Sequence, residues 1–221
     1  MRIVHISDTH MRHNSVKIDT GDVLIHSGDA TESNRILEYQ DEQAYLESLE
    51  EFKTFLRWFS SFDHRVKIYV PGNNDVAFLN FEEEIRNLAK DCGVSILINE
   101  GLIIDEVKFF GVPQTKTFMA HHAYQDFDDE KGLGVIFKKI PKDTEILISH
   151  SPPLKILDLS FDKNDTGSNE LLKAIQKLPK LRLHLFGHCH EQGGKNTRID
   201  HIEFYNSAVQ NKSQVIDFIK K

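Results

Sequence analysis

The chain has 221 residues, of which 39% are hydrophobic and 28% charged. This length predicts a single domain spanning residues 1–221 with a sizeable core, because domains commonly reach ~250 residues before they divide. The formal net charge of −7 argues against a broad basic surface for extended nucleic acid. No apolar run approaches the ~20 residues of a membrane span, and the first run, residues 3–6, is too short for a signal-peptide core, so we expect a cytoplasmic protein without membrane contact.

The first half of the chain alternates between predicted strands and helices. Residues 2–7 and 22–27 are short aliphatic and β-branched runs, which predict strands that end in polar clusters. Between residues 41 and 62, apolar side chains recur every three or four positions, as in an amphipathic helix. A strand over 66–70 precedes a second helix, for which Asn80 is the predicted N-cap and Gly93 the stop.

The second half begins with closely spaced short strands, over residues 95–98, 102–104 and 107–110, whose spacing favours hairpins. A strand over 146–149 and a helix from about 169 to 178 follow, and the last predicted strands cover 181–186, 202–206 and 215–219. These elements predict an α/β fold, a four-layer αββα sandwich of two mixed β-sheets flanked by helices.

Polar motifs directly follow five of the predicted strands. In chain order they are Asp8-Thr9-His10, Gly28-Asp29, Gly72-Asn73-Asn74-Asp75, His150 and Gly187-His188-Cys189-His190. The carboxyl ends of strands in such sheets open into one crevice, so these side chains are predicted to converge there. A turn or a hydrogen-bonded histidine explains any one motif, but not five in succession, and the set predicts a metal site.

These motifs resemble the signature of the calcineurin-like metallophosphoesterase superfamily across nearly the whole chain. The resemblance implies a binuclear site, with Asp8, His10 and His190 on one ion, Asn73, His150 and His188 on the other, and Asp29 bridging. It also implies a metal-bridging hydroxide as the nucleophile. Imidazole, amide and carboxylate ligands without thiolate favour two divalent ions such as Mn²⁺, with Fe or Zn²⁺ as alternatives.

The C-terminal half is similar to the metallophosphoesterase-domain-containing subfamily, through the sequence SHSPP at 149–153 and the sequence LFGHCHE at 185–191. Some members of that subfamily hydrolyse cyclic nucleotides, including 2′,3′-cyclic ones. The resemblance therefore implies a phosphodiesterase that acts on a small phosphorylated substrate, such as a nucleotide.

One position departs from the superfamily signature. Asn74 stands where relatives carry the histidine that protonates the leaving group. Asp75 stands where relatives carry the acidic residue that orients that histidine. Asparagine donates a hydrogen bond but cannot give up a proton, so we expect weak activity on alkyl esters. His122, His121 or His13 could replace the acid, although an exposed loop histidine is the more ordinary interpretation of each. A further alternative is that Asn74 is an introduced substitution.

Three classes of function therefore stay open. The first is a metal-dependent phosphoric ester hydrolase of the kind described above. The second is a metal-binding scaffold or sensor with weak or no catalysis, which Asn74 favours. The third is a protein phosphatase or nuclease, for which a chain of this length and charge leaves little room for an added recognition domain or basic groove.

Overall fold

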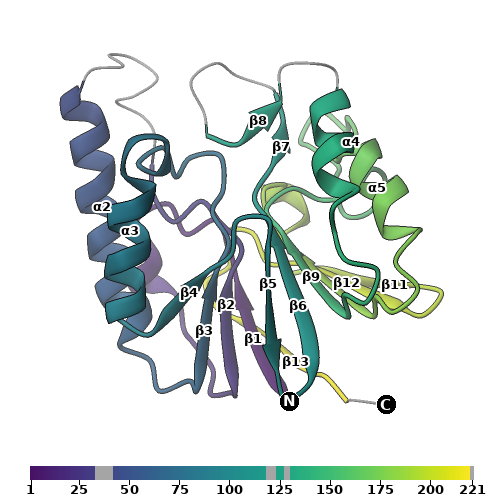
Figure 1. Cartoon of the computed structure of the whole chain (residues 1–221), viewed down its shortest axis with the longest axis horizontal. Coiled ribbons are helices and arrows are strands. Elements are labelled where there is room, and N and C mark those ends of the chain that lie inside the picture. The colour runs from purple at the N-terminus through teal and green to yellow at the C-terminus, as the bar shows by residue number, and fades with distance from the viewer. Residues whose placement is uncertain (33–41, 118–122, 127–129, 220–221) are drawn as a thin grey trace.

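Two mixed β-sheets pack face to face in the computed structural model, which describes residues 1–32, 42–117, 123–126 and 130–219 (Figure 1). The first sheet has the strand order β13-β1-β2-β3-β4. Its parallel strands are β1 (Arg2–Ile6), β2 (Val23–His26), β3 (Val66–Tyr69) and β4 (Val94–Ile96). The last strand of the chain, β13 (Gln214–Asp217), returns antiparallel beside β1.

The second sheet has the strand order β11-β12-β10-β9-β6-β5. Its four central strands run parallel and are β6 (Val107–Val112), β9 (Ile146–Ser149), β10 (Leu183–Phe186) and β12 (Ile202–Asn206). Both edges are antiparallel: β5 (Glu100–Ile104) on β6, and β11 (Asn196–Ile199) on β12. Each sheet is thus mixed, as the sequence predicted.

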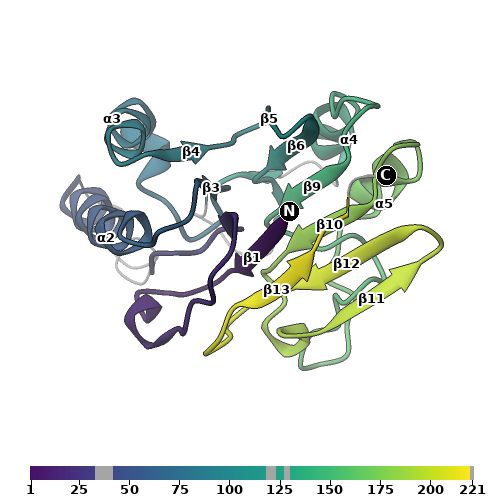
Figure 2. The ribbon, with the colours of Figure 1, turned by 90° about the horizontal axis from the view of Figure 1, so that it is seen from below.

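Helices cover the outer face of each sheet. The helices α2 (Glu42–Ser60) and α3 (Phe78–Asp91) lie on the first sheet, and α4 (Lys131–Phe137) and α5 (Asn169–Ile175) lie on the second (Figures 1 and 2). Side chains such as Ile25 and Ile148 fill the space between the two sheets. The predicted four-layer αββα arrangement is therefore confirmed. Within the described residues, no helix combines the length and apolarity needed to cross a membrane.

The apolar spacing of α2 explains its position. Phe52, Phe55 and Phe59 are at most 1% exposed, and with Leu49 and Leu56 they form the face that packs on the first sheet. Burying an aromatic or leucine side chain of this kind stabilises the fold by roughly 1.5–3 kcal/mol. The predicted amphipathic stripe is the contact between this helix and the sheet.

Two local predictions were wrong. The N-cap of α3 is Ala77 rather than Asn80, because a turn in which the Phe78 N–H donates to the Asp75 carbonyl runs directly into the helix. The strand expected at 95–98 in a hairpin is β4, which instead pairs parallel with β3 and forms the edge of the first sheet. A hairpin is formed only by the next two strands, β5 and β6, among those three.

Several short elements were not predicted. They include α4, β11, the strand pair β7 (Thr115–Lys116) and β8 (Gln125–Asp126), and two 3₁₀ turns, η1 (His13–Ser15) and η2 (His190–Gln192). The β7/β8 pair lies between the two helical layers, beyond the carboxyl ends of the parallel strands (Figure 1). It therefore stands over the edge of the sheets where the polar motifs were expected.

Candidate metal centre

The predicted ligands come together at the carboxyl ends of five strands, β1, β2, β3, β9 and β10. Side-chain donors form two groups, Asp8 with His10 and His190, and Asp29 with His150 and His188, and within each group the atoms lie within 4.8 Å of one another. Asn73 belongs to the second group, since its Oδ1 lies 3.0 Å from His150 Nε2. Seven residues widely separated in sequence thus meet in one place.

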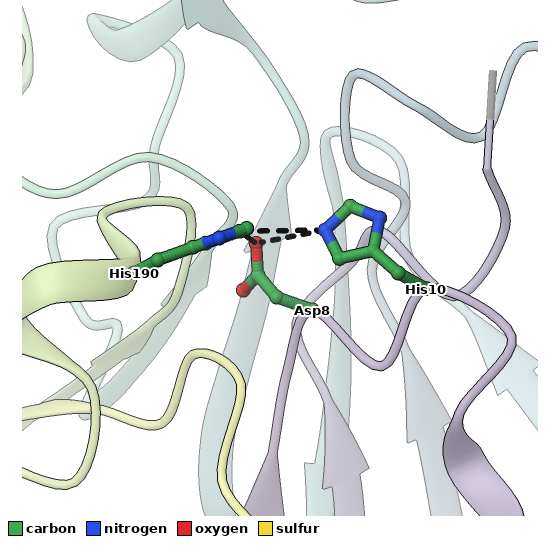
Figure 3. Close-up of side chains that lie close together, drawn as sticks. All are labelled: Asp8, His10 and His190. Atoms are coloured by element: carbon green, nitrogen blue, oxygen red, sulfur yellow. Dashed lines mark hydrogen bonds and ion pairs between the residues drawn. The ribbon is translucent and has the colours of Figure 1, made fainter. Parts of the chain in front are cut away.

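In the first group, three donor atoms face a common point (Figure 3). Asp8 Oδ1 lies 3.3 Å from His190 Nε2 and 4.0 Å from His10 Nε2, and the two imidazole nitrogens are 3.3 Å apart. Asp8 is fully buried, and its other oxygen, Oδ2, accepts a hydrogen bond from the backbone N–H of His188. The hydrogen bond from the His188 N–H holds the carboxylate so that Oδ1 points toward the two histidines.

In the second group, a backbone contact orients the key imidazole. His150 Nδ1 lies 2.8 Å from the carbonyl oxygen of Ser27, to which it donates, so Nε2 faces the site. That Nε2 atom lies 3.3 Å from Asp29 Oδ2 and 3.2 Å from His188 Nδ1. The same Asp29 oxygen is 3.9 Å from His10 Nε2, so Asp29 lies between the two groups.

The backbone at this site is unusual for residues with side chains. Asp8, His10, Asp29 and His188 all have positive φ angles, between 41° and 66°. Such conformations cost of order 1–3 kcal/mol each outside glycine, and they persist where the surrounding structure enforces them, commonly at functional sites. The turns that follow the strands thus place the ligands at the expense of local backbone strain.

Glycines allow two of these turns to approach the ligands closely. Gly28 has a φ of 104°, and a Cβ there would lie 2.6 Å from His150 Nδ1. A Cβ on Gly187 would overlap the side chains of Asp8 and Ser7. Any larger residue at either position would push a ligand side chain out of place.

The charged residues of the second group shift one another's pKa values. Burial disfavours the charge on His150, but the adjacent carboxylate of Asp29 outweighs this effect and raises the pKa of His150 to about 9. Burial acts against the charge of Asp29 as well, yet His150 holds the pKa of that carboxyl well below its usual range. Burial and the nearby charge of His150 lower the pKa of His188 to about 4. The Asp29 carboxylate and the neutral His188 imidazole are thus available as ligands, whereas His150 would release a proton on binding an ion.

The residues fit a divalent metal ion by a further test. Asp8 Oδ1 is a buried carboxylate oxygen that faces two imidazole nitrogens, at 3.3 Å and 4.0 Å, but accepts no well-aligned hydrogen bond among the described residues. A buried acceptor without a partner is costly, and a cation at this point would satisfy it. Imidazole nitrogens with carboxylate and amide oxygens are ligands that suit Mn²⁺, Fe and Zn²⁺.

Asn74 and Asp75 have different environments. Asn74 contacts the site directly, since its Nδ2 donates to Asp29 Oδ2 at 2.6 Å. Asp75 is fully buried, and its carboxylate accepts hydrogen bonds from the backbone N–H groups of Asp29, Ala30, Thr31 and Gly72 and from the hydroxyls of Thr31 and Tyr69. Asp75 therefore connects the ligand loop after β3 to the one after β2.

A cavity of about 490 Å³ opens over both groups. Its ligand side is formed by Asp29, Asn73, Asn74, His188 and His190, and its other walls include Lys116, Thr117, Ser160, Asp165, Thr166 and Glu191. A cavity of similar size, about 480 Å³, lies at the opposite ends of the strands and contains none of the predicted ligands. The wall residues Thr117 and Ser160 carry no sequence signal, because nothing local marks which loops approach the site.

The residues that could replace the missing acid differ in their position relative to the cavity. His13 is 1% exposed and packs on Trp58 and Phe55, with ring centroids 5.0 Å and 5.7 Å away, so it does not line the cavity. His121 and His122 lie outside the described residues. Among three lysine and arginine residues in loops of the sequence, Lys116 lines the cavity, whereas Arg12 and Lys163 do not.

Comparisons with known proteins identify the family of this chain. Residues 1–192 match the family model described as calcineurin-like phosphoesterase. A UPF0046 protein of Caenorhabditis elegans is 32% identical over 232 residues, which cover 98% of this chain and 72% of that protein. Metallophosphoesterase domain-containing protein 1 of Homo sapiens is 30% identical over 219 residues, and the match covers 87% of this chain and 61% of that protein. The chain thus corresponds to about three fifths of the human protein.

More distant similarities extend to a named enzyme and to a solved structure. A 3′,5′-cyclic-nucleotide phosphodiesterase of Nostoc sp. is 22% identical over 178 residues, covering 77% of this chain and 56% of that protein. One crystal structure superimposes with a TM-score of 0.68 at 16% identity, covering 94% of this chain and 90% of that one. At this identity, the structural match supports the fold alone.

Proposed function

Since this chain belongs to the calcineurin-like phosphoesterase family, we propose that it is a binuclear-metal-dependent phosphodiesterase that acts on small substrates such as 2′,3′-cyclic nucleotides. The observation that carries the proposal is the position of Asp29. Its Oδ2 lies 3.3 Å from His150 Nε2 in one group of ligands and 3.9 Å from His10 Nε2 in the other. This position supports the proposal, because Asp29 would lie within reach of an ion in either group.

The residues divide into two coordination sets. Asp8, His10 and His190 would hold one divalent ion, Asn73, His150 and His188 the other, and Asp29 would serve both. When bound, two such ions supply a nucleophilic hydroxide near neutral pH and neutralise charge on the phosphoryl oxygens. Mn²⁺ is our first choice, because the ligand set combines imidazoles with oxygen donors and has no thiolate.

The chain's own groups position this site. The Ser27 carbonyl fixes the His150 ring, and the Asp8 carboxylate is oriented by the His188 backbone N–H. The burial of Asp8, Asp29, Asn73 and His150, each at most 2% exposed, keeps solvent away from the deep side of the site. In such surroundings an electrostatic contact with a reacting phosphoryl group is stronger than in water.

Substrate size follows from the cavity and the charge. A volume of about 490 Å³ is in the range of sites for small molecules, and it exceeds what a phosphoryl group alone requires. The net charge of −7 disfavours a long nucleic acid. A nucleotide-sized phosphodiester is consistent with both, and with the name of the Nostoc relative, a 3′,5′-cyclic-nucleotide phosphodiesterase.

A second function, metal binding with little turnover, is favoured by Asn74. Its side chain donates to Asp29, and an amide cannot protonate a leaving oxygen. Against this function stands the retention of all the ligands around a cavity of substrate size, because a purely structural ion needs no open position.

The test is a panel of 2′,3′- and 3′,5′-cyclic nucleotides and aryl phosphodiesters with the full chain and added Mn²⁺. Turnover that is lost in the ligand variant His150→Ala and kept in Glu83→Gln, at an exposed position of α3 outside the cavity, supports the phosphodiesterase. Stoichiometric ion content without turnover of any ester would instead favour the metal-binding scaffold.

A further inference from the structure

A short two-stranded flap holds Lys116 over the ligand loops. We define the flap as residues 115–117 and 123–126, in which β7 pairs parallel with β8 and Lys116 lies opposite Asp126. The backbone N–H of Ala123 donates to the carbonyl of Asn73 at 2.9 Å, which fastens the flap to the loop that carries Asn73 and Asn74. Lys116 therefore belongs to a segment that is attached to the metal centre.

The Lys116 side chain is braced from the other side of the cavity. Its Nζ donates to the carbonyl of Gly167 at 3.2 Å and lies 3.9 Å from Glu130 Oε1. The other oxygen of Glu130 accepts from Ser168 Oγ and from the backbone N–H of Glu170 at the start of α5. An ammonium has three donors, so these two neighbours leave donor capacity for a bound substrate.

The charge of Lys116 is distinctive within the cavity. Among the described residues that line it, Lys116 is the lone lysine or arginine, and it shares the walls with the carboxylates of Asp165 and Glu191. Its side chain is 34% exposed, so it is neither buried in the protein nor fully in solvent. A bound phosphoester would therefore meet this one protein cation beside the metal ligands.

We propose that Lys116 is a catalytic residue that occupies the functional place vacated by the missing imidazole, contacting the oxygen of the leaving group and protonating it. The inference rests on the proposed phosphodiesterase function. The attacking water forms a new P–O bond and loses a proton to solvent. The bond to the leaving oxygen breaks, its electron pair stays on that oxygen, and the oxygen takes a proton from the Lys116 ammonium. The amine then regains a proton from solvent, so that one phosphodiester and one water give one alcohol and one phosphate monoester, which in a cyclic nucleotide are parts of the same product molecule.

Other described groups are poorly placed for this task. The thiol of Cys189 donates to the carbonyl of Leu159, and burial raises its pKa to about 11. His13 is enclosed by Trp58 and Phe55. The histidines around the site are assigned to the ions, which leaves Lys116 as the available N–H acid of the described walls.

The experiment compares two leaving groups in the Mn²⁺-loaded full chain. In 2′,3′-cyclic AMP the leaving group is a ribose hydroxyl, which needs a proton, whereas 4-nitrophenolate from bis(4-nitrophenyl) phosphate leaves readily without one. We expect Lys116→Gln to lower kcat for the cyclic nucleotide by ~10²-fold or more and for the aryl ester by less than ~10-fold. Lys163→Gln, which removes a lysine from a loop position outside the cavity lining, should change neither.

Two further readouts separate catalysis from structure. Ion content and melting temperature of Lys116→Gln should match the wild type, because Lys116 belongs to neither ligand group and glutamine retains an N–H donor. In an Asn74→His background the imidazole supplies the proton, so Lys116→Gln should then cost less than ~10-fold on the cyclic nucleotide.

Several results would overturn the role of Lys116. Equal losses on both esters would mean that the ammonium only binds phosphate. A selective loss on the cyclic nucleotide in His121→Ala or His122→Ala, with Lys116→Gln unaffected, would assign the acid to that segment. No turnover of either ester by the wild type would reject the phosphodiesterase function itself, and the Lys116 proposal with it.

Discussion

Asn74 holds both carboxylate oxygens of Asp29: its side-chain Nδ2 donates to Oδ2 at 2.6 Å, and its backbone N–H donates to Oδ1 at 2.7 Å. Because Asp29 lies between the two ligand groups, Asn74 helps to orient the carboxylate proposed to serve both ions. Hydrogen bonds to a charged acceptor are the stronger kind, worth about 1.5–3 kcal/mol each. Asn74 cannot act as a general acid, but its side-chain and backbone amides still help to position Asp29.

Restoring an imidazole at this position tests the chemical consequence. We predict that Asn74→His raises kcat on 2′,3′-cyclic nucleotides by ~10-fold, because an imidazole gives up a proton near neutral pH more readily than the ammonium proposed to act in the wild type, and leaves kcat on aryl phosphodiesters within ~3-fold. Steady-state kinetics with saturating Mn²⁺ measures both. Asn74→Ala is the control, since it removes the amide without adding an acid. Unchanged cyclic-nucleotide turnover in Asn74→His would show that a side chain at position 74 does not act on the leaving oxygen.

Asp75 should matter for folding more than its surface neighbours do. Asp75→Asn replaces one carboxylate oxygen, a buried hydrogen-bond acceptor, with an NH₂ group. The N–H and O–H donors that face it come from three segments, around residues 29–31, 69 and 72, and several of them would lose their acceptor. We expect the free energy of unfolding to fall by ~3 kcal/mol or more. Tyr69→Phe removes one of these donors and should cost about 1 kcal/mol.

Urea denaturation of metal-free protein measures both variants, so that any effect on ion binding is kept apart. A loss below about 1 kcal/mol for Asp75→Asn would show that the loops after β2 and β3 do not depend on this carboxylate.

Metal removal should lower thermal stability. An ion that binds only the folded chain stabilises it by ~2.7 kcal/mol at a hundredfold excess over Kd, which is several degrees of melting temperature for a protein of this size. We predict that Mn²⁺ raises the melting temperature and that a chelator reverses the change. His150→Ala should abolish most of the shift, whereas Asp165→Asn should keep it. A shift that is equal in both variants would place the bound ion elsewhere.

Glu51 provides a pH-dependent prediction away from the ligands. Burial, reinforced by the nearby charges of Glu32 and Asp75, raises the pKa of Glu51 from 4.5 to about 7. A carboxyl whose pKa is raised by folding contributes stability that is fully present below pH 4.5 and is lost as the pH rises through about 7. Glu51→Gln cannot ionise, and its amide oxygen can still accept from the backbone N–H of Glu32.

Melting temperatures at pH 5 and pH 8 check this prediction. Glu51→Gln should melt above the wild type at pH 8 and close to it at pH 5. Glu83→Gln, at an exposed position of α3, should show no such pH dependence. A stabilisation of Glu51→Gln that is the same at both pH values would contradict the assigned pKa.

Much of the architecture was predictable because it depends on local patterns. The strand-forming runs that became β1, β2, β3, β9 and β10 are apolar and short, and the helix that became α2 has a regular aromatic stripe. The N-cap of α3 was not predictable from its residues, because the turn at Asp75 replaces an ordinary cap. The flap strands β7 and β8 have two residues each, too few to show a period.

Local sequence patterns were enough to identify the candidate ligands, since each motif directly follows a strand whose carboxyl end opens into the crevice. How those motifs relate to the rest of the chain depends on the three-dimensional fold. It placed Asp75 among buried backbone donors, enclosed His13 between aromatic rings, and brought Lys116 rather than Lys163 to the cavity wall. These outcomes depend on contacts between segments far apart in the chain, such as Ala123 to Asn73 and Lys116 to Gly167, which no local spacing encodes.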